Sequence, residues 1–405
     1  MTRKPSYRFA GYTEPWEEKK LGEVSTHRSG TSIEKYFAEN GVYKVISIGS
    51  YGLDGEYIDQ GIRAISNEVT DKKIVKENEL TMVLNDKTSN GTIIGRTLLI
   101  KSSNEFVVNQ RTEIISPKEI LDSQYAYVLL NGNFREQVKK IVQGGTQIYV
   151  NYSSVEQLKL PLPSLPEQTA IGSFFQDIDQ LISLQQRKLE VLKEQKKTYL
   201  KLLFPAKGQT KPALRFAGFE DEWKEVKLGE IGEIQTGNTP PTNEEDNYEK
   251  NGFPWVTPTD INSLVLHTTS KQLSEVGKSK ARIAKSGSIL VTCIASIGKN
   301  TLVRTDSAFN QQINSLTPSE KYSSYFLLTQ SEIWSRYMLS VAGAGTMQII
   351  NKSDFSNIKA MVPTLPEQEV IGSFFQDLDK AIAKQEEKVN QLKESKQTLL
   401  RKMFI

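Results

Sequence analysis

Two segments of this chain have nearly the same sequence, and a long heptad pattern follows each of them. The first reads Ser164-Leu-Pro-Glu-Gln-Thr-Ala-Ile-Gly-Ser-Phe-Phe-Gln-Asp-Ile-Asp, and the second reads Thr364-Leu-Pro-Glu-Gln-Glu-Val-Ile-Gly-Ser-Phe-Phe-Gln-Asp-Leu-Asp. The opening Arg8-Phe-Ala-Gly-Tyr also returns, as Arg215-Phe-Ala-Gly-Phe, whereas the sequences between each opening and its heptads differ strongly. Self-similarity of this kind indicates a repeated structural unit. The chain therefore consists of two copies of one frame that hold two different inserts, which suggests one scaffold that reads two different things.

The heptad patterns predict two helices with one apolar seam each, because side chains spaced by three and four residues share a face. The first seam contains Phe175, Ile178, Ile182, Gln185, Leu189, Leu192, Lys196, Tyr199 and Leu203. The second contains Phe375, Leu378, Ile382, Gln385, Val389, Leu392, Lys396, Leu399 and Met403. Gln and Lys occupy the same two slots in both seams, and polar seam residues select register and partner orientation. We therefore expect the helices to pair with each other; the alternative is that each packs separately on its own domain.

Each helix should begin at its Leu-Pro-Glu-Gln segment. Pro166 and Pro366 suit the first turn of a helix, and the helix dipole favours the glutamate that follows. Counted from these prolines, each helix spans about 39 residues, or at most about 58 Å at 1.5 Å per residue. Tandem copies related by a pseudo-two-fold axis would lay the helices antiparallel, with one insert near each end of the rod.

Each insert alternates short apolar runs with turn residues, which is typical of strands. The runs are residues 42–48, 79–84, 91–95 and 97–100 in the first insert, and 252–257, 287–295 and 300–304 in the second. Helical patterns follow near residues 125–143 and 322–341. The inserts are therefore expected to be α+β domains. Trp16 and Trp223 repeat in the two openings and are expected to pack inside them.

The composition excludes several classes of protein. No segment approaches the roughly 18 to 20 uninterrupted apolar residues of a membrane span, and the basic N-terminus lacks the apolar run of a signal peptide, so we expect a cytoplasmic protein. His27 and His267 are the two histidines, too few for a structural zinc site or a histidine-based triad. The single cysteine, Cys293, lies in an apolar run and is expected to be buried. A net charge of +3 permits a nucleic-acid partner without requiring one.

The loops between the expected strands carry residue types that read DNA. They are Asn85-Asp-Lys-Thr-Ser-Asn-Gly, Arg96 and Asn109-Gln-Arg-Thr in the first insert, and Thr236-Gly-Asn-Thr-Pro-Pro, Thr257-Pro-Thr-Asp, Ala295-Ser-Ile-Gly-Lys-Asn and Asn310-Gln-Gln-Ile-Asn in the second. Asn and Gln pair bidentately with adenine and Arg or Lys with guanine, while Ser, Thr and backbone amides contact phosphates. The same residue types also form turns and caps, so a structural role stays open for each of them.

Motifs for catalysis do not stand out in this sequence. There is no Gly-x-x-x-x-Gly-Lys-Ser/Thr phosphate loop, and no Gly-x-Gly-x-x-Gly follows a strand. Asn238-Thr-Pro-Pro is similar to the Asn/Asp-Pro-Pro-aromatic loop of adenine methyltransferases, but it has an additional Thr and no aromatic residue after the prolines. Carboxylates and lysines do not show the spacing of a nuclease centre. We therefore expect a protein without a catalytic site.

The two Leu-Pro-Glu-Gln segments occur together with shorter motifs that are spread in order across both halves. These motifs are Asn109-Gln-Arg-Thr, Asn310-Gln-Gln-Ile, Gly237-Asn-Thr-Pro, Ser296-Ile-Gly-Lys, Gly145-Thr-Gln and Gly345-Thr-Met-Gln. In this order they resemble the specificity subunit of type I restriction-modification systems, over the whole chain. The first half departs from the pattern at Ser47-Ile-Gly-Ser-Tyr, where the second half has Trp255-Val-Thr-Pro-Thr-Asp.

The resemblance implies two α/β target recognition domains joined by two long helices that form an antiparallel coiled coil, a pseudo-two-fold tandem repeat of α+β class. We expect the first recognition domain at residues 1–163, the first helix at 164–204, a linker at 205–214, the second recognition domain at 215–363 and the second helix at 364–405. The residues expected to contact DNA are Ser50, Tyr51, Lys87, Thr88, Ser89, Asn90, Arg96, Asn109, Gln110, Arg111, Thr146, Gln147, Asn238, Thr239, Thr257, Thr259, Asp260, Ser296, Lys299, Asn310, Gln311, Gln312, Thr346 and Gln348.

The resemblance also implies a non-catalytic reader of double-stranded DNA. Such a subunit binds two modification subunits, which carry an S-adenosylmethionine-dependent adenine methyltransferase, and through them restriction subunits with an ATP-driven motor and a nuclease. S-adenosylmethionine, ATP and Mg are then expected in the partners, no cofactor and no metal in this chain, and no membrane contact. Two domains at the ends of an antiparallel rod would read two inverted half-sites, with centres roughly 34 to 36 Å apart.

Two other classes of protein stay open. A coiled-coil adaptor whose inserts bind proteins would show no salt-dependent affinity for duplex DNA. A single-chain restriction or modification enzyme would methylate DNA with S-adenosylmethionine and no other subunit.

Overall fold

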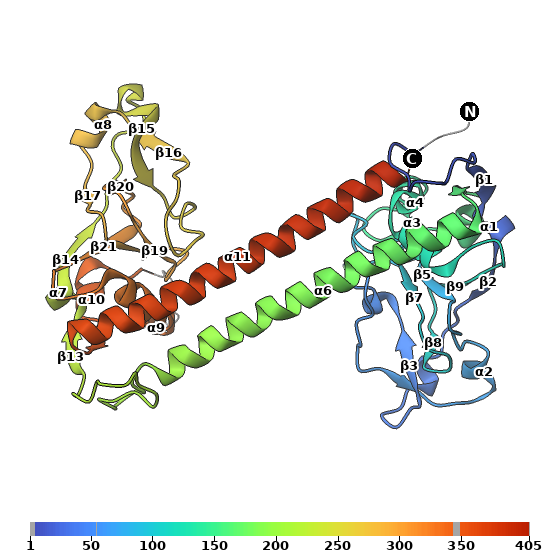
Figure 1. The fold of residues 1–405 in the computed structure, drawn as a ribbon, viewed down its shortest axis with the longest axis horizontal. Coiled ribbons are helices and arrows are strands. Elements are labelled where there is room, and N and C mark those ends of the chain that lie inside the picture. The colour runs from blue at the N-terminus through green and yellow to red at the C-terminus, as the bar shows by residue number, and fades with distance from the viewer. Residues whose placement is uncertain (1–4, 54, 343–348, 405) are drawn as a thin grey trace. The chain divides into compact units, whose positions relative to one another are not determined.

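The computed structural model describes residues 5–53, 55–342 and 349–404. The chain divides into two compact units: unit 1 contains Met1–Gln186 and Glu387–Ile405, and unit 2 contains Arg187–Glu386. Two long helices, α6 (Leu165–Leu202) and α11 (Leu365–Met403), each run from one unit into the other (Figure 1). Each unit therefore combines the insert of one half of the sequence with a long-helix segment from the other half.

Unit 1 is built from short strands around a four-stranded sheet of order β2-β9-β5-β7. Its strands are β1 (Glu17–Lys20), β2 (Ser25–Ser29), β3 (Tyr43–Ile46), β4 (Arg63–Ala64), β5 (Leu80–Val83), β6 (Asn85–Asp86), β7 (Thr97–Leu99), β8 (Phe106–Val108), β9 (Thr112–Pro117), β10 (Gln143–Gly144), β11 (Ile148–Tyr149) and β12 (Lys159–Leu162). Its shorter helices are α1 (Leu21–Val24), α2 (Glu68–Asp71), α3 (Ser123–Asn131), α4 (Asn133–Lys140), α5 (Tyr152–Val155), and the one-turn 3-10 helices η1 (Glu34–Tyr36) and η2 (Ile48–Ser50). Smaller sheets have the orders β1-β12, β4-β3-β8 and β10-β11-β6.

Unit 2 repeats the plan with a four-stranded sheet of order β14-β21-β18-β19 and a second of order β16-β15-β20-β17. Its strands are β13 (Lys224–Lys227), β14 (Gly232–Thr236), β15 (Tyr248–Val256), β16 (Lys271–Leu273), β17 (Ile283–Ala284), β18 (Ile289–Thr292), β19 (Asn300–Leu302), β20 (Ser307–Phe309), β21 (Ile313–Pro318) and β22 (Lys359–Val362). Its shorter helices are α7 (Leu228–Ile231), α8 (Glu275–Ser279), α9 (Ser324–Ala342), α10 (Lys352–Ser356) and the 3-10 helix η3 (Glu245–Asn247). The strands β5 and β18 are buried along their whole length, as their continuous apolar runs predict.

The predicted seams of the long helices are confirmed, because every seam residue is buried or partly buried. In unit 1, Asp179 near the start of α6 forms an ion pair with Lys396 near the end of α11. In unit 2, Lys196 of α6 pairs with Asp379 of α11 at 2.9 Å and also with Glu332 of α9. The helices are therefore antiparallel in each unit, and the repeated Lys of the seam meets the repeated Asp of the other helix.

The Leu-Pro-Glu-Gln segment fixes the start of each long helix against the opening segment. Glu167 is fully buried and accepts hydrogen bonds from Arg8 at 2.6 and 2.7 Å and from the indole of Trp16 at 3.1 Å. Glu367 receives Arg215 in the same bidentate way, at 2.8 and 2.7 Å. From the sequence, these glutamates are expected to interact favourably with the helix dipole. In the structure their main contact is a buried ion pair with an arginine.

One phenylalanine at the end of each long helix completes the core of the unit that contains it. The ring of Phe404 packs against Trp16, Tyr125 and Phe175 in unit 1, with ring centroids 5.7 to 6.4 Å apart. The ring of Phe204 packs in the same way against Trp223, Phe326 and Phe375 in unit 2. The expected packing role of both tryptophans is confirmed, since Trp16 and Trp223 are buried.

Two expectations about the inserts are wrong in part. Residues 91–95 form a turn instead of a strand, because Gly91 and Gly95 have positive φ angles of 66° and 71° and the peptide N–H groups of Ile93 and Ile94 donate to a side chain. The predicted helix near residues 125–143 is two helices, α3 and α4, which meet at Gly132. Its counterpart in unit 2 is the single helix α9.

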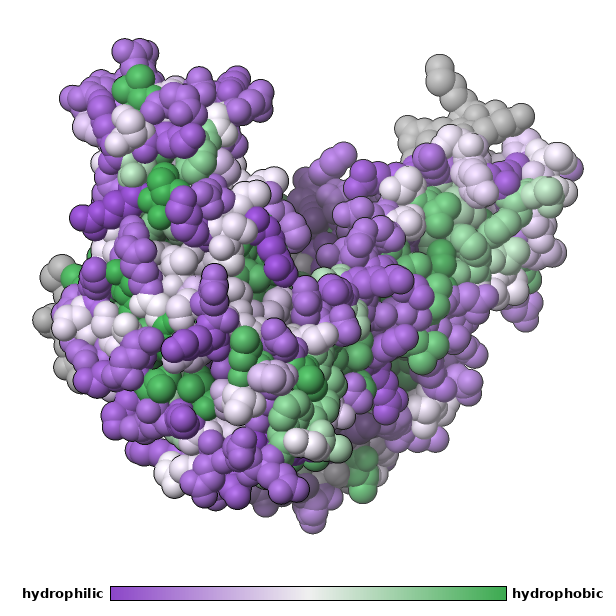
Figure 2. Space-filling view, turned by 60° about the vertical axis from the view of Figure 1, so that its left-hand side comes forward, coloured by the Kyte–Doolittle hydropathy of each residue, from purple (hydrophilic) through white to green (hydrophobic). Residues whose placement is uncertain are grey.

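Hydrophilic residues predominate on the face of the molecule in Figure 2. None of the helices in the described part of the chain is long and apolar enough to cross a membrane. Cys293 is buried as expected, and burial raises the pKa of its thiol to about 12.

Candidate DNA interface

In each unit the polar loops gather around one turn, residues 109–111 in unit 1 and 310–312 in unit 2. The strand before each turn pairs in parallel with another strand, β8 with β3 and β20 with β15. Parallel strands end at the same edge of a sheet, so the segments after β3 and β15 lie beside the turns. Figure 1 labels these strands in both units.

Two further segments meet each turn through equivalent backbone contacts. The N–H of Leu84 donates to the carbonyl of Arg111 at 2.9 Å, and the N–H of Cys293 donates to that of Gln312 at 2.8 Å. Gly30 directly follows β2, and Gly237 directly follows β14. A Cβ atom on Gly30 would lie 2.0 Å from the carbonyl oxygen of Asn109, and one on Gly237 would lie 2.3 Å from that of Asn310. These close approaches require glycine in both units. The backbone of this edge is therefore shared by the units, while the side chains on it differ.

The segments after β3 and β15 are capped at the same position. The N–H of Ser47 donates to the hydroxyl of Ser50 at 3.1 Å, and the N–H of Thr257 donates to the Asp260 carboxylate at 2.8 Å. Thr257 Oγ1 also donates to Asp260 at 2.6 Å, and Thr259 Oγ1 lies 2.8 Å from Thr257 Oγ1. Burial alone would raise the pKa of Asp260, but these hydrogen bonds outweigh it and lower the pKa. Asp260 therefore holds the loop in shape, and Thr259 is the exposed residue on it.

Three of the residues expected at the DNA surface are buried in unit 1, and two of them, Ser50 and Tyr51, lie in the segment after β3. Ser50 is fully buried, and Tyr51 is 3% exposed and donates from its hydroxyl to Thr81 at 3.0 Å. Burial raises the pKa of the Tyr51 hydroxyl. Both side chains support the segment after β3 from inside, so we leave them out of the candidate interface.

The turn of unit 1 is tied to a carboxylate of η1. The side-chain amides of Asn109 and Gln110 both donate to Glu34 Oε1 at 3.0 Å, and the Ser32 hydroxyl donates to the same carboxylate. These hydrogen bonds, those from Ser32 and Asn109 first, lower the pKa of Glu34 to about 2. Asn109 is 8% exposed, and its side-chain amide oxygen accepts from the N–H groups of Ile33 and Gln110 at 3.2 and 2.8 Å. Gln110 and Arg111 are exposed.

The turn of unit 2 is held in a similar way. Asn310 donates to Thr239 Oγ1 at 3.2 Å and accepts from the N–H of Gln312 at 2.8 Å. Asn238 donates to the carbonyl of Lys280 and accepts from the N–H of Arg282, both at 2.7 Å. In the sequence these amides suggest base contacts. In the structure they join loops to one another. The side chain of Gln311 is exposed, and Thr239 donates to it.

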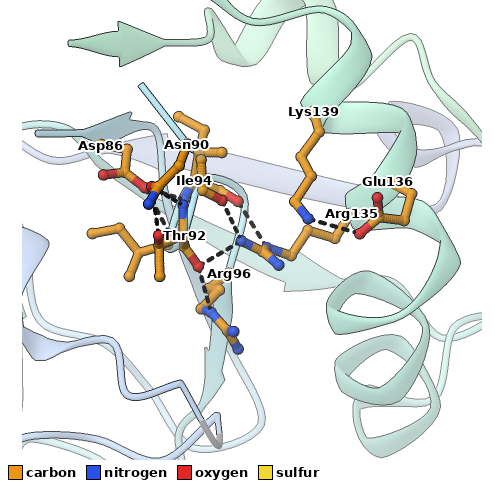
Figure 3. A network of polar contacts seen from close by, with 10 residues as sticks. Asp86, Asn90, Thr92, Ile94, Arg96, Arg135, Glu136 and Lys139 are labelled. Atoms are coloured by element: carbon orange, nitrogen blue, oxygen red, sulfur yellow. Dashed lines mark hydrogen bonds and ion pairs between the residues drawn. The ribbon is translucent and has the colours of Figure 1, made fainter. Parts of the chain in front are cut away.

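The loop after β5 in unit 1, residues 85–96, is closed on itself (Figure 3). The buried carboxylate of Asp86 accepts from the N–H groups of Thr88 and Ile93 at 2.9 and 2.7 Å. The amide oxygen of Asn90 accepts from the N–H of Thr92 at 3.2 Å. Burial would raise the pKa of Asp86, but the hydrogen bonds lower it. Lys87, Thr88, Ser89 and Asn90 form the exposed tip, and Arg96 is half-buried beside it.

A hairpin lies beside this loop, because β11 pairs with both β10 and β6. Thr146 and Gln147 are exposed between its strands. The corresponding residues of unit 2, Thr346 and Gln348, lie outside the described residues. The loop after β18 carries Ser296, which is half-buried, and Lys299, which is exposed.

The structure thus brings the predicted loops of each insert to one edge and separates their residues into two groups. Side chains that hold the loops are Ser50, Tyr51, Asn109, Asn238, Asp260 and Asn310. Exposed or half-buried side chains at the edge are Lys87, Thr88, Ser89, Asn90, Arg96, Gln110, Arg111, Thr146, Gln147, Thr239, Thr257, Thr259, Ser296, Lys299, Gln311 and Gln312. Arg135 of α4, whose guanidinium donates to the loop of residues 85–96, is not among the residues predicted from the sequence. A single arginine in a helical pattern gives no signal that could have identified it.

Comparisons with known proteins find relatives that match most of the chain. The family model for the type I restriction modification DNA specificity domain matches residues 13–194 and 220–394. The type I restriction enzyme MjaVIII specificity subunit of Methanocaldococcus jannaschii is 24% identical over 412 residues, which cover 96% of this chain and 91% of that protein. The HindI specificity subunit of Haemophilus influenzae is 23% identical, over 86% of this chain and 90% of that protein.

Two solved structures share the fold. The type I restriction-modification S subunit from M. genitalium has a TM-score of 0.69 at 16% identity and covers 100% of this chain and 99% of its own. A chain from a study of complex assembly and conformational transition of the type I R-M system has a TM-score of 0.56 at 18% identity and covers 98% of this chain and 99% of its own.

Proposed function

The chain belongs to the type I restriction modification DNA specificity family, and on this premise we propose that each of its two units reads one half of a bipartite DNA target. One observation carries the proposal: the same turn and the same backbone contacts recur in both units, while the exposed side chains on them differ. A shared backbone with different side chains is what two different half-sites require, because base edges are read by side chains and positions are fixed by the backbone.

We further propose that the reactions on DNA are performed by partner subunits. Two modification subunits, which use S-adenosylmethionine, would methylate adenine in the two half-sites, and restriction subunits that use ATP and Mg would join through them. The repeated frame supports the number two, because each unit offers the same Leu-Pro-Glu-Gln segment, the same Arg–Glu pair and the same end of a long helix. We place this complex in the cytoplasm, with the DNA.

The test is single-molecule methylation mapping in a host without adenine methylation. The host carries the neighbouring modification subunit with this chain or without it. A new adenine-methylated motif of two parts separated by an unspecified spacer is the expected result. If no motif appears although the modification subunit is active beside another specificity chain, the protein is an adaptor of another kind or an inactive allele.

A separate assay tests the division of labour. The purified chain with S-adenosylmethionine and duplex DNA is expected to transfer no methyl group, and methylation should begin when the modification subunit is added. Transfer by the chain alone would show that it is itself a modification enzyme.

A further inference from the structure

Arg135 of α4 points toward the loop of residues 85–96 and binds its backbone (Figure 3). Its Nε donates to the carbonyl of Ile94 at 2.9 Å, and its Nη2 donates to those of Gly91 and Thr92 at 2.8 and 2.7 Å. The residue is 7% exposed. Burial, with Arg96 nearby, lowers the pKa of its guanidinium to about 10, so the group stays charged at neutral pH. Among the described residues, the hydrogen bonds of its guanidinium all go to the backbone of residues 91–94.

The internal hydrogen bonds of the loop use the polar groups of some of the exposed tip side chains and leave others without a partner in the loop. Thr88 Oγ1 lies 2.7 Å from the Asp86 carboxylate, and Asn90 accepts from Thr92. Both are therefore engaged within the loop. In the part of the chain that the structure describes, the side chains of Lys87 and Ser89 make no hydrogen bond or ion pair, and both are exposed. The loop is thus held by internal hydrogen bonds while Lys87 and Ser89 stay exposed on it.

In unit 2 the equivalent helix, α9, anchors the equivalent loop, which follows β18. Ser335 of α9 donates to the carbonyl of Gly298 at 2.7 Å and accepts from Asn300 at 2.7 Å. This loop has only residues 294–297 between its fixed ends, whereas the loop of unit 1 has residues 85–94. A serine reaches the shorter loop, and the longer loop needs the longer reach and several donors of an arginine.

We propose that Arg135 is a positioning residue for DNA recognition, which holds residues 87–90 so that Lys87 and Ser89 read bases in the half-site of unit 1. This inference rests on the proposed function. Arg135 is proposed not to touch DNA, because the residue is buried and its guanidinium is bound to the backbone of the loop. Holding the loop in its bound shape removes the entropy cost of ordering it on binding, and this gain applies to the correct sequence, where both side chains find their partners.

The test uses the full chain assembled with its modification subunit and three duplexes: the intact target, one with the first half-site scrambled and one with the second scrambled. Arg135→Met keeps the buried stem and removes the donors. It is expected to reduce the affinity ratio between intact and scrambled DNA for one half-site by about tenfold, the order expected for one lost base-pair contact. The ratio for the other half-site should stay unchanged and serves as the internal control.

The salt dependence of non-specific binding separates positioning from direct contact. A residue that neutralises a phosphate contributes to the slope of log affinity against log salt, so Arg135→Met should leave that slope unchanged. Lys139→Met is the matched control. It removes the same charge from the same helix, where Lys139 pairs with Glu136 at 2.9 Å, and should retain both half-site ratios. Arg135→Lys, which keeps one anchoring donor, should restore part of the lost ratio.

Thermal unfolding shows whether Arg135→Met folds. If it does not fold, Asp86→Asn replaces it, because this substitution weakens the hydrogen bonds inside the same loop and is expected to reduce the same half-site ratio. A folded variant that keeps full discrimination at both half-sites, beside a wild-type complex that discriminates, overturns the inference. A reduced salt slope for Arg135→Met also overturns it, because Arg135 would then contact phosphate. A wild-type complex without discrimination would instead refute the proposed function.

Discussion

Glu167 illustrates at the scale of one residue how the frame is held together. The helix dipole is a sufficient reason for a glutamate in the first turn, but its carboxylate is also the buried partner of Arg8 and Trp16. Sequence reasoning places the residue in the correct helix and turn. It could not identify the ion pair, because Arg8 lies in a separate segment, and the antiparallel pairing of β1 with β12, just before the helix, brings the opening to Glu167.

Glu167→Gln is expected to destabilise unit 1. The substitution leaves the Arg8 guanidinium, 15% exposed, without its counter-charge, and loss of one partner of a buried pair costs about 3 kcal/mol. Chemical denaturation of the variant measures the change in the free energy of unfolding. Glu225→Gln is the matched control, since Glu225 pairs with Lys359 on the surface and should unfold like the wild type. Equal effects of the two substitutions would contradict the structural role of Glu167.

Glu34 gives the turn of unit 1 a dependence on pH. Its pKa in the folded chain is about 2, below the ordinary value of 4.5. A lowered pKa stabilises the fold above the ordinary value, and the stabilisation is lost as the pH falls from about 4.5 towards about 2. Unfolding measured from about pH 5 to about pH 3 should therefore show a steeper loss for the wild type than for Glu34→Gln. Parallel curves would show that Glu34 does not hold the turn.

Among the elements, the long helices were the most predictable from sequence and the loop after β5 the least. Seam positions follow from heptad spacing alone, and all of them are at least partly buried. Residues 91–95 look like a strand because of two adjacent isoleucines, but the Asp86 carboxylate and the Arg135 guanidinium bind the backbone that a sheet would need. Such side-chain capture of backbone groups depends on tertiary contacts, so composition could not show it.

The polar slots of the seam provide a test at the scale of the helix pair. Lys196→Met leaves Glu332 and Asp379 facing each other without a cation, and we expect a loss of about 3 kcal/mol. Lys396→Met in the equivalent slot leaves a single carboxylate, Asp179, which is more exposed than Asp379. We expect a loss of about 1 kcal/mol in the free energy of unfolding. Denaturation of both variants under the same conditions measures the difference. A larger effect for Lys396 would contradict the burial seen in the structure.

For the whole molecule, each unit takes part of its core from the other half of the sequence. Phe404 closes the core of unit 1, and Phe204 closes that of unit 2. The sequence repeat predicts two domains and an antiparallel helix pair, and the structure contains both. The half-sites could not be predicted, because the exposed residues at each edge depend on which amides and hydroxyls the fold uses internally, as Asn109 and Ser50 show.

Replacement of residues 25–143 by the first insert of another member of the family is the most direct test of the claim that each unit reads one half-site. The frame residues Arg8, Trp16, Glu167 and Phe404 remain in place, so the new insert meets the same support. Methylation mapping of a host with the chimaera and the modification subunit should show one half-site changed and the other, with the spacer, unchanged. Changes in both half-sites would contradict the account.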